Sequence, residues 1–426
     1  MVTTKAQWNN FQKIGFRFIF IYFILQISTF FVSFLPFTDA LIEWATFNIQ
    51  SVPVWFSKTF LNIEIIYFPG GSGDTTYNYV EVLVFFIITI IGVAIWSIID
   101  SKRQNYNRLL RVFSIYVSYY VGANMLSYGL SKVFYLQFSE PSFLELFRTY
   151  AESSPMGIAW TFMGASKTYT MFSGFAEVIG GLLLFHRRTR TFGALMIFSV
   201  MLNVFMINMS YDVPVKLFSF HLMIEALFIA SLDYKRILNL FVINKPKTFS
   251  NELKPLFQNK THGIAATVVK LVFIGTVIYT YMSSNIEYWK QRYQAPEPCF
   301  YGVYDTELFI KNKDTIPPLL TDNTRWKRLM MDKGYLSRYI VIKGMKDQSN
   351  WYTYELDSIQ NTIKMISARD SLDVLNLSYV KNANKLSLKG LWNNDSIEVK
   401  FKKFDTSKIL LTNRGFNWIN EYPYNR

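Results

Sequence analysis

The amino-acid sequence predicts an α-helical polytopic membrane bundle of about seven spans, followed by a C-terminal antiparallel β-barrel or β-sandwich domain. Two observations carry this prediction. Before about residue 285 of the 426-residue chain, apolar residues are concentrated in runs of about 20, the length that crosses a hydrocarbon layer of about 30 Å. From about residue 288 onward, short alternating segments between polar turns replace these runs, which is typical of β-strands.

The apolar runs define the expected spans and domains. The spans are residues 14–36, 77–99, 109–135, 168–186, 191–211, 216–232 and 263–283. The first run follows basic residues, as a signal-peptide core does, but it is longer than such a core and lacks a small-residue cleavage site, so we expect it to remain as a helix. The expected domains are a two-span region with an outer loop (1–108), a four-helix bundle (109–245), a cytoplasmic loop with the last span (246–287) and an extracytoplasmic β-domain (288–426).

Lysine and arginine are distributed unevenly over the expected loops. They gather after the second, fourth and sixth spans, for example at Lys102, Arg187 and Lys235, whereas the opposite loops carry few. By the positive-inside rule the N-terminus is cytoplasmic and the β-domain lies outside, which in a bacterium means the inner (cytoplasmic) membrane and the periplasm. These loops also explain much of the formal net charge of +14, so we expect the lipid bilayer, and not nucleic acid, as a partner.

The C-terminal region contains eight segments with the length and character of strands. They are residues 301–310, 335–342, 351–356, 362–367, 375–380, 385–391, 396–401 and 409–411, with hairpin turns expected at 381–384 and 392–395. The end of the chain, 413–426, holds many large aromatic side chains, which indicates that it docks against something. Packing onto the chain's own β-domain is favoured over a site for an envelope protein partner.

Ionisable side chains interrupt the apolar spans. Glu177, His221 and Glu225 lie in the middle of spans, and Lys132 lies near the end of another. A charged side chain at bilayer depth costs about 2.5 to 3.5 kcal/mol on insertion scales, so such residues usually face the bundle interior, pair with each other or serve a function. They are therefore the best pointer to a functional site.

Further polar residues extend this group. In the third span a stripe recurs every four residues, made of Tyr116, Tyr120, Asn124, Tyr128 and Lys132. In the fourth span, glycines at positions 174, 180 and 181 allow a neighbouring helix to approach closely.

The rise per residue then estimates the depth of each polar group. Asn124, Glu177, Asn203 and Glu225 fall at about 12 to 16 Å from the outer ends of their helices, with Tyr128 and His221 at intermediate depth and Lys132 shallow. One polar cavity that opens outward is the expected arrangement. Packing between helices explains Asn124 and Asn203 adequately, whereas for Glu177, His221 and Glu225 together we favour a ligand site. The ligand-binding candidates are Lys132, Asn124, Tyr128, Glu177, Asn203, His221 and Glu225.

Several chemistries are not expected. Cys299 is the single cysteine, which excludes an intramolecular disulfide, a dithiol relay and zinc sites built on cysteine pairs, and a buried inert thiol is the favoured interpretation. His186 and His262 lie at the cytoplasmic boundary, so haem held by two histidines is not expected, and neither is a metal site. The glycine-rich stretch 70–74 lacks the preceding strand and the following Lys-Ser or Lys-Thr of a nucleotide loop, and we interpret it as an outer turn.

Two short motifs resemble those of the DoxX family of small bacterial membrane proteins. They are Tyr128-Gly129-Leu130-Ser131-Lys132 at the end of one span, and Glu177-Val178-Ile179-Gly180-Gly181-Leu182-Leu183-Leu184 followed by arginines in the next. The resemblance spans about residues 110–235 and implies a four-helix membrane bundle. Because some DoxX relatives are associated with quinone-linked oxidation of sulfur compounds or with membrane oxidoreductase complexes, it also implies a quinone-type ligand. Lys132 and Glu177 match the family pattern, whereas His221 and Glu225 rest on the depth argument alone.

The leading functional expectation is a DoxX-like inner-membrane protein whose outward-opening polar site binds a small polar or quinone-type ligand, in redox chemistry or envelope maintenance. Two alternatives stay open. The first is a membrane-anchored assembly or interaction module that acts through its β-domain, and the second is a proton-coupled transporter, which needs an inner exit where Lys270 is one of few polar residues. The sequence does not decide the ligand, the oligomeric state, the role of Cys299 or whether the protein is an enzyme.

Overall fold

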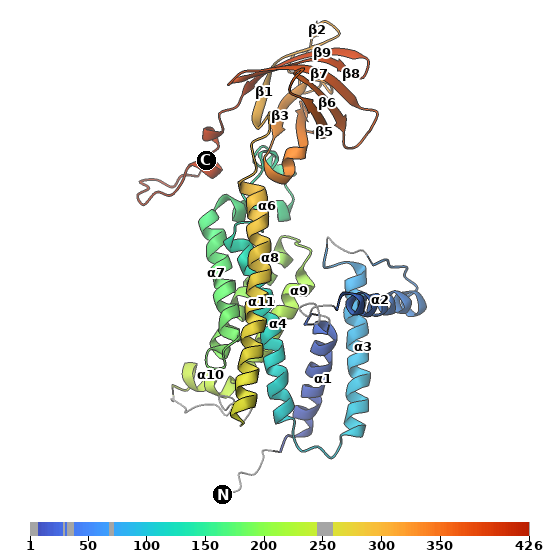
Figure 1. The fold of residues 1–426 in the computed structure, drawn as a ribbon, viewed down its shortest axis with the longest axis vertical. Coiled ribbons are helices and arrows are strands. Elements are labelled where there is room, and N and C mark those ends of the chain that lie inside the picture. Colours follow the sequence, from blue (N-terminus) through green and yellow to red (C-terminus); the bar gives the residue numbers. More distant parts are fainter. Residues whose placement is uncertain (1–6, 29, 32–37, 68–71, 245–258, 426) are drawn as a thin grey trace. The chain divides into compact units, whose positions relative to one another are not determined.

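The chain is described by a computed structural model that covers residues 7–28, 30–31, 38–67, 72–244 and 259–425. It divides into two compact units, and each of them is discontinuous in sequence (Figure 1). The helical unit comprises Met1–Val133 and Phe172–Ser283, and the barrel unit comprises Phe134–Met171 and Ser284–Arg426. The segment between the third and fourth expected spans therefore belongs to the same unit as the C-terminal domain.

The helical unit is built from long helices that lie side by side, with α2 running across α3 (Figure 1). The helices are α1 (Asn10–Ile27), α2 (Asp39–Phe56), α3 (Thr76–Ile99), α4 (Asn107–Val133), α7 (Lys167–Leu184), α8 (Arg190–Ser210), α9 (Lys216–Ser231), α10 (Tyr234–Phe241) and α11 (Lys260–Tyr293), and a π-helical segment, Ser57–Leu61, follows α2. Each expected span overlaps one of these helices. The first expected span, 14–36, is longer than its helix, because α1 ends at Ile27, and residues 32–36 lie outside the described part of the chain.

Among the described residues, three helices are long and apolar enough to cross a membrane, namely α3, α8 and α11. A fourth candidate arises if α9 and α10, which are bent by 78° at their junction, count as one span. Length and composition decide which helices qualify as spans. α4 and α7 are not among them, because Lys132, Glu177 and several polar or aromatic residues make these helices less apolar. The helical unit therefore has the features of a membrane-associated bundle, with three or four spans supported by composition.

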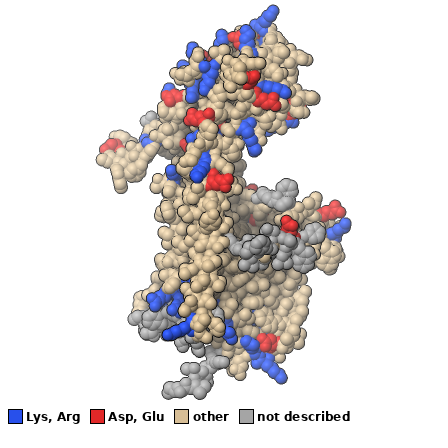
Figure 2. Space-filling model, in the orientation of Figure 1, with Lys and Arg blue, Asp and Glu red and all other residues tan. Residues whose placement is uncertain are grey.

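The surface of the helical unit agrees with membrane association. On the face drawn in Figure 2, lysine and arginine side chains of this unit gather near one end of its helices and leave a wide belt without charge. α3 and α11 also expose apolar side chains, including Ile91 and Ile98 of α3 and Val269 and Val272 of α11, which are 53% to 78% exposed. Apolar surface of this extent is typical of contact with lipid.

α4 and α7 cross in backbone contact at four glycines. A Cβ atom placed on Gly129 would lie 2.7 Å from Val178 Cγ2 and 2.9 Å from the Gly174 carbonyl oxygen, and one on Gly174 would lie 2.6 Å from the Gly129 carbonyl oxygen. The same reciprocal contact recurs two turns away, where Gly122 and Gly181 each approach the other's carbonyl oxygen. Any side chain at these positions would force the helices apart, so glycine sets the distance between α4 and α7.

A buried arginine ties α1 to the connection between α3 and α4. Arg17 is 4% exposed, and its guanidinium donates to the Tyr106 hydroxyl at 2.8 Å, to Ser97 Oγ at 2.7 Å and to the Asp100 carbonyl at 3.1 Å. The Tyr106 hydroxyl in turn donates to the Asp100 carboxylate at 2.9 Å. Burying a guanidinium is tolerable because all these acceptors surround it.

Asp74 caps a helix that is distant in the sequence. Its carboxylate accepts hydrogen bonds from the backbone nitrogens of Lys216 (2.7 Å) and Leu217 (2.9 Å), the first residues of α9. A carboxylate at a helix N-terminus satisfies free N–H groups and complements the helix dipole. The stretch 70–74, interpreted from sequence as an outer turn, therefore ends in a residue that fixes the start of α9, while residues 70 and 71 lie outside the described part.

The C-terminal domain is an antiparallel β-barrel, which confirms the coarse expectation of a β-domain and selects the barrel over the sandwich. Its strands are β1 (Gly302–Lys311), β2 (Asp314–Thr315), β3 (Trp326–Met331), β4 (Tyr339–Gly344), β5 (Ser349–Asp357), β6 (Thr362–Ser367), β7 (Val374–Lys381), β8 (Lys385–Trp392) and β9 (Asp395–Lys403). Each long strand pairs with its neighbour in sequence, and β9 returns to pair with β1, so eight strands close the barrel while β2 extends one end of β1. Closure leaves no long free edge.

The barrel interior is filled by side chains. Alternate strand residues point inward, and the largest fully buried ones include Tyr304, Phe309, Tyr352 and Phe401. An eight-stranded barrel has just enough interior space for such side chains. The hairpin turns expected at 381–384 and 392–395 are present, and Asn393 adopts the left-handed conformation (φ 54°) that a two-residue turn requires.

Three strand predictions need correction. β3 was missed, because Trp326–Met331 follows a polar loop and lacks a clean alternation of apolar and polar residues. The first part of the expected strand 335–342 is a 3₁₀ turn, Gly334–Arg338, and β4 begins only at Tyr339. The expected strand 409–411 is wrong, since a short helix, α12 (Leu410–Asn413), occupies that stretch. With β9 already paired to β1, the barrel has no edge left for a further strand.

The excursion between α4 and α7 packs on the outside of the barrel. It contains α5 (Phe143–Leu146) and α6 (Pro155–Ala165). Phe143 lies against Val303, Met330 and Val341 on the outer barrel wall. Lys343 Nζ donates to the Phe147 carbonyl at 2.7 Å, and the Arg328 guanidinium lies 3.9 Å from the centre of the Phe147 ring. The excursion therefore covers an apolar patch that the barrel would otherwise expose.

The aromatic C-terminus does not pack onto the barrel. Phe416, Trp418, Ile419 and Tyr422 are 77% to 90% exposed. The expectation that these rings bury against the chain's own β-domain is therefore wrong for the described residues. Their aromatic character predicted a docking function, but composition alone does not say whether the surface is in the same molecule.

We predict that Gly129→Ala will destabilise the helical unit, whereas Gly275→Ala will not. The new methyl group at position 129 meets backbone atoms of α7, and overpacking of this kind costs about 1 to 3 kcal/mol. Gly275 lies on α11, and a methyl group added there would meet nothing within 4 Å, so it serves as the matched control. Thermal unfolding of the purified protein in detergent measures both, and equal midpoints for the two variants would contradict the close crossing.

Candidate functional site

Lys132 and Glu177 form a buried ion pair between α4 and α7. The Lys132 ammonium lies 2.5 Å from one Glu177 carboxylate oxygen and 2.6 Å from the other, and the two residues are 5% and 2% exposed. The glycine crossing brings them together, because a Cβ atom on Gly174 would lie 2.7 Å from Lys132 Cβ. The two residues that match the DoxX pattern therefore meet each other.

The geometry of this pair points to a structural contribution. Both carboxylate oxygens of Glu177 are engaged by one ammonium group, so neither charge is left bare in the bundle. Removing one partner of a buried pair is strongly destabilising, because the remaining charge is then uncompensated. The pair holds the end of α4 against α7, and both carboxylate oxygens of Glu177 have a partner.

His221 is satisfied by two local partners. Its Nδ1 lies 2.7 Å from the Leu217 carbonyl oxygen, one turn earlier in α9, and its Nε2 lies 2.8 Å from the hydroxyl of Tyr22 in α1. A carbonyl oxygen can only accept, so Nδ1 carries a proton and the tyrosine hydroxyl can donate to Nε2. The two rings also stack, with centroids 5.8 Å apart. His221 therefore links α9 to α1.

Glu225 is the unusual group of the helical unit. It is fully buried, one turn after His221, and neither carboxyl oxygen has a hydrogen-bond partner among the described residues. Three tyrosines, Tyr22, Tyr116 and Tyr120, lie within electrostatic range of it, and within the described chain no cation pairs with it. Leaving a buried polar group unpaired costs about 1 to 3 kcal/mol, so this position calls for an explanation.

The remaining candidates are Asn124, Tyr128 and Asn203. Asn124 is buried and donates to the Tyr120 carbonyl of its own helix at 2.9 Å. Tyr128 is 38% exposed, and its ring lies 5.7 Å from that of Phe218. Asn203 is exposed on α8 and joins neither polar centre. Of the seven candidates, Lys132 and Glu177 contact each other, and His221 and Glu225 lie one turn apart on α9.

Tyr22 was missed by the sequence reasoning. It lies in the first span, for which only the basic flank and the length were considered, and a tyrosine in an apolar run carries no charge to draw notice. The position of α1 against α4 and α3 brings it to His221. The same helix places Gln26 close by, with a buried side-chain oxygen that has no partner among the described residues.

An aromatic cluster surrounds the same helices. The rings of Phe23, Phe113 and Phe228 lie 5.5 to 6.3 Å apart and belong to one buried apolar core with Tyr120 and its neighbours. Such a setting, with a few polar groups among aromatic rings, is typical of sites for small ligands with a polar head and an apolar body. Within the described residues, no group of three or more His, Cys, Asp or Glu side chains is arranged to hold a metal ion.

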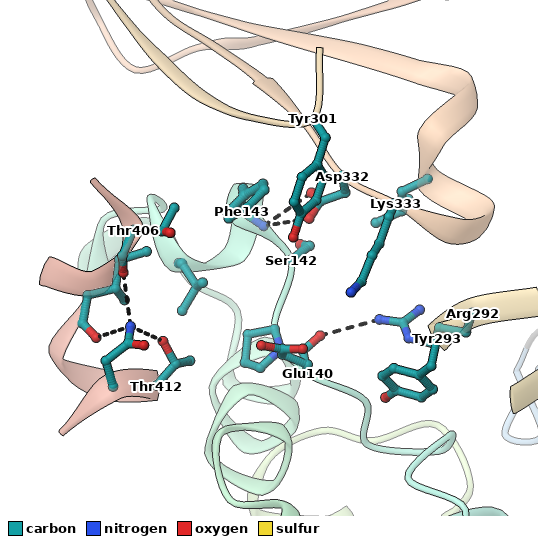
Figure 3. A pocket seen from close by; sticks show the side chains of 15 residues that line it. Glu140, Ser142, Phe143, Arg292, Tyr293, Tyr301, Asp332, Lys333, Thr406 and Thr412 are labelled. Carbon is teal, nitrogen blue, oxygen red and sulfur yellow. Dashed lines mark hydrogen bonds between the residues drawn. The ribbon is translucent and has the colours of Figure 1, made fainter. Parts of the chain in front are cut away.

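A second candidate site lies in the barrel unit. A cavity of about 180 Å³ is bounded by the end of α11, the loop before α5, the turn after β3 and the C-terminal helix (Figure 3). Asp332 lies at its edge, and its carboxylate oxygens accept from the Phe143 backbone nitrogen at 3.1 and 3.2 Å. Burial raises the pKa of Asp332 to about 6, and the nearby carboxylates Glu145 and Glu140 add to this while Arg292 opposes it. This site could not be predicted from the sequence, because the residues that line the cavity come from four segments that are distant in the sequence.

Comparison with known proteins finds a relative of this chain in a bacterium. The uncharacterized protein YwoB of Bacillus subtilis (strain 168) is 33% identical over 122 residues, a stretch that covers 29% of this chain and 77% of YwoB. The chain belongs to the same family as YwoB. The name of YwoB carries no activity, so the relationship supplies no function. No family model and no solved structure matches the chain, and the DoxX resemblance stays a prediction.

A double-mutant cycle tests the structural contribution of the ion pair. Lys132→Met or Glu177→Leu alone should lower the free energy of unfolding by about 3 to 5 kcal/mol, because each leaves one buried charge unpaired. The double variant should lose much less than the sum, since it buries no charge. Thermal unfolding in detergent provides the measurement, and additive losses would show that the two side chains do not depend on each other.

Asp332 should make the stability of the barrel unit depend on pH. Its folded pKa of about 6 lies above the ordinary value of 3.8, so the folded state binds the proton more tightly than the unfolded chain. Stability should therefore fall as the pH rises from about 4 to about 6, by roughly 1 to 3 kcal/mol, and then level off. Asp332→Asn keeps an acceptor for the Phe143 N–H group and should remove this slope, measured by tryptophan fluorescence during unfolding. An identical slope in both proteins would contradict the assignment.

Proposed function

We propose that this protein is an integral protein of a bacterial inner membrane whose helical unit binds a small polar or quinone-type ligand at the centre formed by Glu225, His221 and Tyr22. In this proposal α1, α4, α7 and α9 cross the bilayer together with the three helices that qualify by composition, which gives seven spans. The N-terminus is cytoplasmic and the barrel is periplasmic, as the distribution of lysine and arginine in the loops favours.

The observation that carries the proposal is the fully buried Glu225 carboxyl group without a hydrogen-bond partner in the described chain. A carboxylic acid held neutral offers one O–H donor and an acceptor oxygen, and the tyrosine hydroxyls around it offer further donors. A quinone presents two carbonyl acceptors on a flat ring, which suits hydroxyl donors among phenylalanine rings. A ligand of this class would supply the partner that the protein itself does not provide.

The ion pair fits this proposal as a support for the site. Lys132 and Glu177 fix α4 against α7, and Tyr116 and Tyr120 on the same face of α4 are the residues that lie near Glu225. The DoxX resemblance favours a quinone among the polar ligands, because quinone-linked oxidation is associated with some members of that family. The choice between redox chemistry and envelope maintenance depends on the ligand.

Glu225→Leu should separate ligand binding from stability. The substitution removes an unpaired buried polar group, so the thermal midpoint without ligand should stay equal or rise. Stabilisation by a short-chain quinone, measured by thermal unfolding in detergent, should require at least about ten times more quinone, because a buried hydrogen bond to the ligand is lost.

Asn203→Leu is the matched control for this experiment. It also replaces a polar side chain in a predicted span, but Asn203 is exposed, so the response to quinone should equal that of the unchanged protein. Two results would contradict the proposal: no stabilisation of the unchanged protein by quinones, or an unaltered quinone response accompanied by a large loss of basal stability in Glu225→Leu. The second result would mark Glu225 as a structural residue.

A further inference from the structure

The chain continues beyond the closed barrel as a short segment with unusual exposure. After β9 and α12, residues 414–425 form what we call the aromatic hook. Phe416, Trp418, Ile419 and Tyr422 of the hook are 77%, 90%, 79% and 85% exposed. Single exposed apolar side chains are ordinary, but four large ones within seven residues form a contiguous apolar surface that usually marks an interaction site.

The hook is folded on itself through polar contacts. The Arg414 guanidinium donates to the Asn420 side-chain oxygen at 2.6 Å and lies 4.0 Å from the centre of the Tyr424 ring. Gly415 takes the left-handed conformation (φ 69°) that lets the chain turn beside Arg414. These contacts occupy the inner side of the hook and leave its large apolar side chains outward. A segment arranged in this way loses less conformational freedom when it binds.

The root of the hook lies beside the end of α11 within the barrel unit. The cavity of Figure 3 has Arg292 and Tyr293, the last residues of α11, on one side and Thr406 and Thr412 on the other. α11 is one of the helices that qualify as a membrane span, and its expected apolar stretch ends at residue 283, about 15 Å before Tyr293. Twelve residues can extend up to about 40 Å, so the hook can reach the membrane surface from its root.

The chemistry of the hook matches the interfacial zone of a bilayer. Tryptophan and tyrosine are enriched where the hydrocarbon core meets the headgroups, because their rings are apolar with one polar edge. Arg414 and Glu421 balance each other, so the described hook carries no formal net charge and has no basic cluster that would select anionic lipids.

From these observations we infer that the aromatic hook inserts Phe416, Trp418, Ile419 and Tyr422 into the membrane interface next to the end of α11. The occupant of this surface is therefore lipid. The inference rests on the proposed crossing of the membrane by α11. The role of the aromatic hook would be to hold the barrel unit at the bilayer surface by a second contact, in addition to the covalent connections between the barrel unit and the helices.

Site-specific fluorescence in vesicles tests the inference on the full chain. In a Cys299→Ser background, one cysteine at a time is introduced by Ile419→Cys, Val272→Cys or Leu372→Cys and labelled with an environment-sensitive nitrobenzoxadiazole dye. Val272 is an exposed apolar residue of α11 and serves as the bilayer reference. Leu372 is 82% exposed in the turn between β6 and β7, at the barrel end opposite the cavity of Figure 3, and serves as the water reference. The vesicles contain phosphatidylcholine with or without a nitroxide-labelled phosphatidylcholine.

The dye at position 419 should be quenched by the lipid-borne nitroxide and protected from aqueous iodide, as at position 272. The combined change Phe416→Ser and Trp418→Ser should return it to the iodide quenching of position 372. If position 419 resembles position 372 while position 272 is quenched by lipid, the inference fails although α11 crosses the membrane. Protection of position 419 from both quenchers would also overturn it and would assign the hook to a protein contact. Lack of lipid quenching at position 272 would overturn the membrane crossing itself.

Discussion

The backbone contact between α4 and α7 is the constraint on which the rest of the helical unit depends. Glycines at 122 and 129 of one helix meet glycines at 174 and 181 of the other, so two helix backbones approach to a distance that no other residue would permit. Membrane helices gain little from apolar burial against each other, and close backbone packing with interhelical polar contacts is what holds them together. The crossing provides the close backbone packing, and it brings Lys132 and Glu177 together as an interhelical polar contact.

The two carboxylates of the bundle differ in a physically informative way. Glu177 meets a cation that engages both of its oxygens, so its charge is compensated. Glu225 lies near three tyrosines and has no cation partner in the described chain, so a bare charge there would cost several kcal/mol. Tyr116 and Tyr120 of α4 lie near Glu225, whereas Lys132 at the end of the same helix pairs with Glu177.

The parts of the structure that follow from short-range rules could be predicted from the sequence. Helix limits follow from apolar run length, and β6 and the hairpin turns follow from alternation and from Asn-rich pairs. The contact partner of each polar residue could not be predicted in this way. In an apolar span the sequence has no amphipathic pattern that shows which face of the helix turns toward its neighbours. Asn203 was therefore included among the ligand-binding candidates although it turns outward, and Tyr22 was not included. The depth estimate placed Lys132 shallow and Glu177 at about 12 to 16 Å, whereas the two side chains are in direct contact.

The barrel unit combines two segments that are separate in the sequence. The chain leaves α4 at Val133, packs Phe143 and Phe147 on the outer barrel wall, and returns as α7. Both helices of the glycine crossing are therefore covalently continuous with a segment that the barrel holds. Lys343, which is almost fully buried, donates to the Phe147 carbonyl, so this contact includes a desolvated charge and would be costly to break. The segment between α4 and α7 is therefore held by its own packing on the barrel wall, and it is covalently continuous with both helices.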